Sequence, residues 1–182
     1  MRLQWQRPES GIDRLALYLA APLLALLTVV LILFSFLYST VRVEGDSMVP
    51  ELQSGDRVLL RRSYEYPLRG DLVVFDRSTG VPVVKRVIGL PTDQVKMDSG
   101  HAFVNGAPER GTYSVLYSED DISHGPYTVP AGSLYVAGDN RPQSLDSRDF
   151  GAVPQEDVLG EAILVYWPLS HFGRVDRAGV SD

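Results

Sequence analysis

The chain has 182 residues, a formal net charge of -6 at pH 7 and no cysteine. This length suits one domain of medium size together with a membrane segment, and the missing cysteines exclude disulfides and thiolate metal sites. From residue 42 onward the chain carries 14 basic and 21 acidic residues, a balance that argues against nucleic acid as a partner.

A long apolar run lies near the start of the chain. Residues 15–41 contain no charged residue, and Arg14 and Arg42 bound this run of 27 residues. Because roughly 20 apolar residues suffice for a helix to cross a bilayer, the run predicts a single transmembrane helix. A cleaved secretory signal would have an apolar core of only about 7–15 residues and a small-residue exit. The greater length and the aromatic end of the run favour an uncleaved anchor.

The flanks of the apolar run predict its orientation. Three arginines precede it, and short basic flanks stay on the cytoplasmic side. We therefore expect a cytoplasmic tail over residues 1–14, a transmembrane anchor over 15–41, and an extracytoplasmic domain over 42–182.

The segment beyond the anchor has the pattern of a β domain. Short apolar runs such as "LVVFD", "VVKRVIGLP" and "EAILVYWPL" are separated by Gly, Pro, Asn and Asp. This spacing predicts a mainly β fold, with the N-terminal transmembrane helix followed by an antiparallel β-sheet domain. Residues 109–126 are polar and are expected to form a surface excursion.

The chain has only two lysines, and their surroundings differ. Lys96 lies between two aspartates, which should keep it charged and solvated. Lys85 follows the strand alternation of Val83 and Val87, so these three side chains share one face. If that face is buried, desolvation and the adjacent Arg86 lower the pKa of Lys85, and a neutral lysine can act as a general base. The alternative is an edge-strand lysine that points to water.

A second signal is the polar stretch "GDNRPQSLDSRDFGAVP", which directly follows the apolar strand "SLYVA". It contains Ser144, Asp146 and Arg148 within five residues. The stretch is either a hydrophilic loop with local Asx turns or a braced loop that carries an active-site hydroxyl.

The sequence gives little support for a histidine-based catalytic site or a metal site. The three histidines lie in loop-like, polar or terminal contexts, and no Gly-x-Ser-x-Gly elbow is present. No histidine has the spacing of a metal site. We therefore expect surface histidines, no metal and no cofactor.

Four ordered motifs behind one N-terminal anchor complete the pattern: "GDSMVPEL", "GDLVVF", "VVKRVIGLPTD" and "GDNRPQSLDSRDFGAVP". Together they resemble bacterial type I signal peptidases, which are membrane serine proteases with a Ser/Lys dyad. The resemblance implies that Ser47 is the nucleophile and Lys85 the general base. It also implies that the Ser144 hydroxyl orients the base and that Asp146 and Arg148 form a supporting pair.

The same resemblance implies the substrate and the location. The expected substrates are exported preproteins, whose signal peptides would be cleaved after small residues at positions -1 and -3. The expected location is the bacterial plasma membrane, with lipid as a further partner and the oligomeric state left open. Three positions depart from the usual pattern: Gly45 where some members have serine, Glu51 where threonine is usual, and Thr92 where glycine is usual.

Three other functions remain open alternatives at this point. A dedicated processing peptidase of the same chemistry would act on one specialised pilin or conjugation substrate. A self-cleaving Ser/Lys regulator of the repressor type would need a soluble chain with an N-terminal DNA-binding domain. A non-enzymatic membrane-anchored β domain would keep the fold without the activity.

Overall fold

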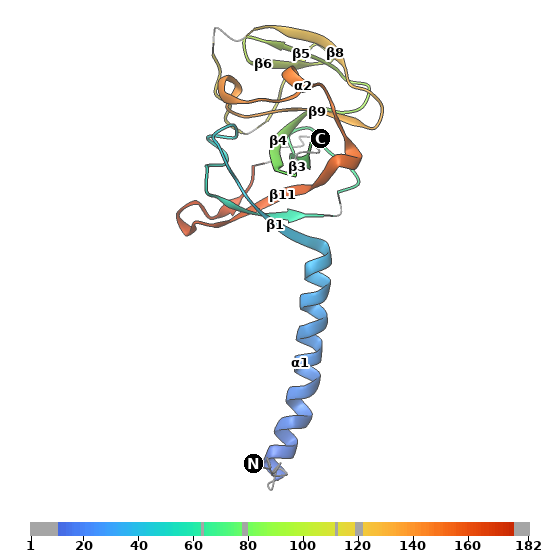
Figure 1. Cartoon of the computed structure of the whole chain (residues 1–182), viewed down its shortest axis with the longest axis vertical. Helices are drawn as coiled ribbons and strands as arrows, with labels where there is room; N and C mark the ends of the chain where they lie inside the picture. Colours follow the sequence, from blue (N-terminus) through green and yellow to red (C-terminus); the bar gives the residue numbers. More distant parts are fainter. Residues whose placement is uncertain (1–10, 63, 78–79, 112, 119–121, 177–182) are drawn as a thin grey trace. The chain divides into compact units, whose positions relative to one another are not determined.

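The structure is a computed structural model that describes residues 11–62, 64–77, 80–111, 113–118 and 122–176 (Figure 1). The chain divides into two units, Met1–Leu37 and Tyr38–Asp182, and each is considered by itself.

The first unit contains the helix α1, Gly11–Leu37. Its segment Tyr18–Leu37 has a mean hydropathy of 2.6 and, by length and composition, can cross a membrane. The apolar run was expected to remain an anchor as far as Val41, but the helix ends at Leu37. The next residues form strand β1, Tyr38–Arg42, whose backbone groups pair with a neighbouring strand. This pairing satisfies the same N–H and C=O groups that a longer helix would have used.

The second unit holds twelve strands among the described residues, in two sheets. The larger sheet contains β1, β2 (Arg57–Arg61), β3 (Leu72–Asp76), β4 (Pro82–Gly89), β9 (Ser133–Ala137), β10 (Val153–Pro154), β11 (Val158–Trp167) and β12 (Gly173–Arg174). The smaller sheet contains β5 (Gln94–Asp98), β6 (His101–Val104), β7 (Ala107–Pro108) and β8 (His124–Thr128). The short helices are α2 (Ser147–Phe150) and the 3-10 turns η1 (Arg141–Gln143), η2 (Gln155–Asp157) and η3 (Leu169–His171).

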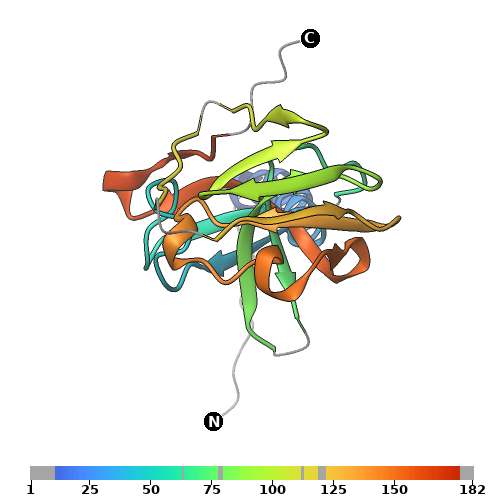
Figure 2. The same cartoon turned by 90° about the horizontal axis from the view of Figure 1, so that it is seen from above.

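The strand order confirms the expected antiparallel β domain. The larger sheet runs β1-β2-β11-β3-β4-β9-β10, with β12 beside β11, and the smaller sheet runs β7-β6-β5-β8. Every pairing between named strands is antiparallel. Within the β domain, the smaller sheet lies at the end away from β1 (Figure 1), and the view of Figure 2 looks onto its strands.

Burial along the strands explains where the site can form. In β2 the burial alternates, with Val58 and Leu60 inside and both terminal arginines outside. By contrast, β3 is buried on both faces from Leu72 to Phe75. Its neighbour β4 pairs with β3 on one side and β9 on the other. β4 is therefore a central strand, and Lys85 lies in its buried part, so the edge-strand interpretation of Lys85 is wrong.

Candidate active site

The turn that carries Ser47 is held by buried residues on its C-terminal side. Met48 and Leu52 are almost fully buried in one hydrophobic cluster, and the Leu52 N–H donates to the Met48 carbonyl at 2.9 Å. Gly45 enters the turn with a φ of 81°, a conformation that glycine adopts without steric cost. Ser47 is thus fixed on a compact turn that follows β1.

Lys85 reaches this turn from the interior of the sheet. It is 3% exposed, and its strand neighbour Val87 is fully buried. Val83 is partly buried and packs against the same cluster as Val87, so the condition for a buried Lys85 is met. The Lys85 Nζ lies 2.6 Å from the Ser47 Oγ, although the two residues are 38 positions apart in the sequence. The fold therefore brings the two predicted dyad residues into hydrogen-bond contact.

The surroundings of Lys85 weaken its positive charge. Burial lowers the pKa of Lys85 to about 8. The charge of Arg148 also lowers this pKa, whereas the charges of Asp146 and Asp139 raise it. The prediction that Arg86 also lowers the pKa of Lys85 is wrong. Its guanidinium is bound by both carboxylate oxygens of Asp139, so its charge is compensated locally.

Asp146 organises the predicted supporting pair. Its carboxylate receives Arg148 Nε and Nη2, both at 2.9 Å, and caps the first turn of α2 through the Arg148 N–H. The Ser144 hydroxyl donates to the same carboxylate at 2.7 Å, as does the Gly138 N–H at 3.0 Å. Burial opposes ionisation of Asp146, but these donors hold its pKa below the ordinary value.

Ser144 contacts Asp146 of the supporting pair and not the predicted base, Lys85. Its hydroxyl donates to Asp146, and within the described residues no hydrogen bond joins it to Lys85. The structure thus links Ser144 to Lys85 only through the carboxylate whose charge raises the pKa of Lys85. That Ser144 orients the amine directly stays a prediction.

Two residues of the polar stretch received no role from the sequence. The Asn140 backbone N–H donates to the Ser47 carbonyl at 3.0 Å, and its side-chain amide donates to the Asp46 carbonyl at 3.1 Å. A Cβ on Gly138 would lie 2.5 Å from both the Ser144 Cβ and the Ser47 carbonyl oxygen. Only glycine fits this space. The one feature of the sequence that could have indicated a role for Gly138 and Asn140 is their position in the polar stretch directly after β9.

Residues 109–126 were expected on the surface, but part of this segment packs against the site. The Leu116 N–H donates to the Asp139 carbonyl at 2.8 Å, and the Arg86 guanidinium lies 3.7 Å from the centre of the Tyr113 ring. Arg86 and Asp139 are both fully buried. A buried ion pair of this kind needs such additional contacts, because desolvation of both charges is costly.

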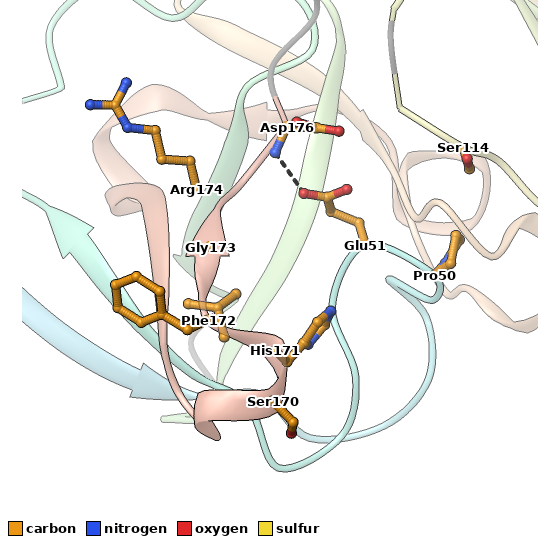
Figure 3. Close-up of a pocket in the computed structure, with 10 residues that line it drawn as sticks. Pro50, Glu51, Ser114, Ser170, His171, Phe172, Gly173, Arg174 and Asp176 are labelled. Carbon is orange, nitrogen blue, oxygen red and sulfur yellow. Dashed lines mark hydrogen bonds between the residues drawn. The ribbon is translucent and has the colours of Figure 1, made fainter.

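A polar cavity of 390 Å³ lies beside the nucleophile's turn (Figure 3). Pro50 and Glu51 line one wall, and the C-terminal segment up to Asp176 lines another. Glu51 accepts the Asp176 N–H at 2.6 Å, and Arg86 donates to the Asp176 carbonyl at 2.9 Å. Glu51 therefore helps to hold the C-terminal segment. Neither dyad residue lines this cavity.

Two of the three histidines have partners outside the dyad. A ring nitrogen of His171 lies 2.8 Å from the Asp56 carboxylate, and His101 stacks on Tyr117 with 3.9 Å between ring centres. In the part of the chain that the structure describes, no group of three or more His, Asp or Glu side chains is arranged to hold a metal ion.

Comparisons with known proteins agree with the motifs. The family described as "Signal peptidase, peptidase S26" matches residues 16–167. A signal peptidase I from Leptolyngbya laminosa is 36% identical over 145 residues, covering 73% of this chain and 70% of that protein. The signal peptidase I U of Bacillus subtilis is 34% identical over 153 residues, covering 78% of this chain and 80% of that protein. A crystal structure of a signal peptidase I from Enterococcus faecalis is 33% identical, with a TM-score of 0.47 over 54% of this chain and 98% of that one.

The family match covers most of the chain, and it includes the turn of Ser47, the strand of Lys85 and the whole polar stretch after β9. The two curated relatives each exceed 30% identity over more than two thirds of this chain. This protein therefore belongs to the signal peptidase family of serine proteases, peptidase S26.

Proposed function

We propose that this chain cleaves the signal peptides of exported preproteins, with Ser47 as the nucleophile and Lys85 as the general base. The observation that carries the proposal is the 2.6 Å separation of the Lys85 Nζ and the Ser47 Oγ. A serine hydroxyl is a weak nucleophile until a base within hydrogen-bond reach removes its proton. The pKa of about 8 supports this role, since it leaves part of Lys85 neutral near neutral pH.

The chemistry follows from this pair. The Ser47 Oγ attacks the carbonyl carbon at the end of the signal peptide while the neutral Lys85 amine accepts the hydroxyl proton. The C–N bond then breaks, and Lys85 returns the proton to the leaving amine of the mature protein. A water molecule, deprotonated by Lys85, next attacks the ester carbonyl carbon of Ser47. The bond to the Ser47 Oγ breaks, the signal peptide leaves with its new carboxylate, and Lys85 returns the proton to the Ser47 Oγ.

The oxyanion needs a hydrogen-bond donor. The backbone N–H of Ser47 donates no hydrogen bond to any other described residue, so it is available to the carbonyl oxygen of the substrate. Gly45 has no side-chain hydroxyl to contribute. A single preorganised donor of this kind is worth about 3 kcal/mol in the transition state.

Ser144, Asp146 and Arg148 support the base in this proposal. The ionised Asp146 stabilises the ammonium form of Lys85 as it develops during proton transfer, which offsets part of the cost of burial. Arg148 holds that carboxylate from both of its oxygens. Ser144 is proposed to orient the amine once substrate excludes water from the site.

We further propose that α1 anchors the enzyme in the bacterial plasma membrane. The basic residues before the helix favour a cytoplasmic tail over residues 1–14. The anchor then ends at Leu37, and the β domain lies outside the cytoplasm with its substrate at the membrane surface. Membrane lipid is accordingly a partner of the chain.

The test uses the full chain, purified in detergent, with two kinds of substrate: a preprotein that carries an Ala-x-Ala leader, and a pilin or conjugation precursor. Wild type is compared with Ser47→Ala, with Lys85→Met and with Lys96→Met. Lys85→Met removes the amine and keeps the stem, while Lys96→Met alters the other lysine, which is exposed and paired with Asp98. The new N-terminus of the product is sequenced.

The proposal expects cleavage after the small residue by wild type and Lys96→Met, and none by the two dyad variants. Cleavage by Lys85→Met at the wild-type rate would remove the dyad from consideration. If wild type cleaves only a specialised pilin or conjugation substrate, the chain is a dedicated processing peptidase. A folded wild type that cleaves none of these substrates would be a non-enzymatic β domain.

A further inference from the structure

Asn140 binds the peptide groups on both sides of Ser47. Its side-chain Nδ2 donates to the Asp46 carbonyl at 3.1 Å, and its backbone N–H donates to the Ser47 carbonyl at 3.0 Å. These two carbonyls belong to the peptide groups that precede and follow the Ser47 Cα. Asn140 lies 94 positions from Asp46 in the sequence. A distant residue therefore sets how both peptide groups beside the nucleophile are turned.

The peptide group between Asp46 and Ser47 contains the proposed oxyanion donor. This peptide bond is trans, and a trans peptide group is planar with its C=O and N–H pointing in opposite directions. The Asp46 carbonyl and the Ser47 N–H are the two ends of this group. A hydrogen bond that holds the carbonyl therefore also aims the N–H, which donates to no other described residue.

The turn itself gives the Asp46 carbonyl one local anchor. The Val49 N–H donates to this carbonyl at 3.2 Å and closes the turn within its own segment. The bond from Asn140 adds an anchor from outside the turn, and the Asn140 side chain that makes it is only 7% exposed. Two donors from different segments restrict the tilt of a peptide group more than a single local one does.

Asn140 does not use its side chain for the usual purpose at its position. It is the N-cap residue of η1, where an asparagine side chain commonly accepts a hydrogen bond from a backbone N–H of the helix. At η1 this capping bond is not formed. The amide donates to Asp46 instead, with a longer contact of 3.4 Å to the Gln143 Oε1. The side chain thus serves the turn of the nucleophile and not its own helix.

We propose that Asn140 is a positioning residue for the oxyanion donor, which aims the Ser47 N–H at the carbonyl oxygen of the scissile peptide bond. This inference rests on the proposed function, because it takes Ser47 as the nucleophile. Gly45 offers no side-chain donor, so the alignment of the Ser47 N–H carries more weight. An oxyanion donor acts where charge develops in the transition state. Its misalignment therefore lowers kcat and leaves the binding of substrate unchanged.

The test compares two inhibitors that differ only at the reacting carbon. Both are Ala-x-Ala leader peptides, and the C-terminal carboxyl is replaced by an aldehyde in one and by an alcohol in the other. The Ser47 Oγ adds to the aldehyde carbon, its proton passes to Lys85, and the former carbonyl oxygen becomes the oxyanion. The alcohol cannot form this adduct. Both inhibition constants are measured on the full chain in detergent, together with kcat and KM for a leader peptide.

Two variants remove the donor and one serves as the control. Asn140→Ala removes the amide and keeps the backbone N–H, while Asn140→Ser leaves a smaller void with a side chain too short to replace the amide. The control is Asn105→Gly. The Asn105 amide also donates to a carboxylate, that of Asp93, at 2.9 Å, and its φ of 53° suits glycine.

Both Asn140 variants should lose about 10- to 100-fold in kcat, with KM within about twofold of wild type. The inhibition constant of the aldehyde should rise by the factor by which kcat falls, and that of the alcohol should not change. The pH midpoint of kcat/KM should stay near 8, because Asn140 makes no contact with Lys85 among the described hydrogen bonds. Asn105→Gly should match wild type in every measurement.

Several results would overturn the inference while the dyad stands. They are equal losses of affinity for the aldehyde and the alcohol, a rise in KM at constant kcat, and wild-type kinetics in the Asn140 variants. A shift of the pH midpoint would mean that Asn140 acts on the base instead. Loss of the folded state in both Asn140 variants, seen by circular dichroism, would assign the residue to the fold alone. An aldehyde that inhibits wild type no better than the alcohol would contradict the proposed function itself, because Ser47 would then form no adduct.

Discussion

The pH dependence of cleavage tests the state of Lys85 directly. Its pKa is about 8, lowered from the ordinary value of 10.5 because the amine is buried. This difference corresponds to about 3 kcal/mol against the ammonium form. If Lys85 is the general base, kcat/KM follows the fraction of free enzyme in which the amine is neutral.

The expected profile can be worked out from that pKa. About a tenth of Lys85 is neutral at pH 7 and about nine tenths at pH 9, so kcat/KM should rise about tenfold and then level off. A lysine with the ordinary pKa would be almost wholly charged at pH 7. It would then give a rise of about 100-fold over the same interval, with no plateau by pH 9.

The assay is the initial rate of cleavage of a soluble leader peptide at low substrate concentration in detergent, from pH 6 to pH 10. Lys96→Met serves as the control and should follow the wild-type profile. A rise that continues without a plateau beyond pH 9.5 would refute the buried state of Lys85. A single limb near pH 6.5 would instead indicate a histidine base.

Three further predictions concern the same residues and their neighbours. Lys85→Met should raise the free energy of unfolding at pH 7 by up to about 3 kcal/mol. This gain should shrink as pH rises from about 8 to 10.5, because in that range the lysine proton is bound in the unfolded wild type but not in the folded wild type. A gain that does not change with pH in denaturant titrations would contradict this prediction. Gly138→Ala must displace Ser144 or the Ser47 carbonyl by about 1 Å and should cost about 100-fold in kcat/KM, whereas Gly173→Ala, which meets no atom, should stay near wild type. Thr92 has a φ of 73°, so Thr92→Gly should stabilise the fold by about 1 kcal/mol in urea unfolding, and an unchanged midpoint would argue against strain at this turn.

The features that sequence predicted well depend on short-range rules. A run of 27 residues without charge is enough to predict a membrane-spanning helix, because the thickness of the bilayer requires only a minimum length of apolar sequence. Asp146, Ser144 and Arg148 lie within five residues, and a short capped helix brings them together without help from the rest of the chain. Alternation around Lys85 likewise placed it on the valine face of its strand.

Other features were decided by partners distant in the sequence. The helix ends at Leu37 because Tyr38–Arg42 finds a strand partner at Arg57–Arg61, and no local signal separates Thr40 and Val41 from the apolar run. The segment near Tyr113 read as a polar excursion, since its place against Arg86 depends on a buried ion pair formed elsewhere.

The chemistry of Lys85 shows the same division. Its position in a β-strand pattern is a local property, and the motif around it is visible in one dimension. Its pKa is not, because desolvation comes from β3 and β9 on either side, and the opposing charges come from Asp139 and Asp146. The 2.6 Å contact with Ser47 depends on the turn after β1 packing its Met48 into the core. Burial and proximity are sums over the whole fold, and so only the tertiary structure could decide them.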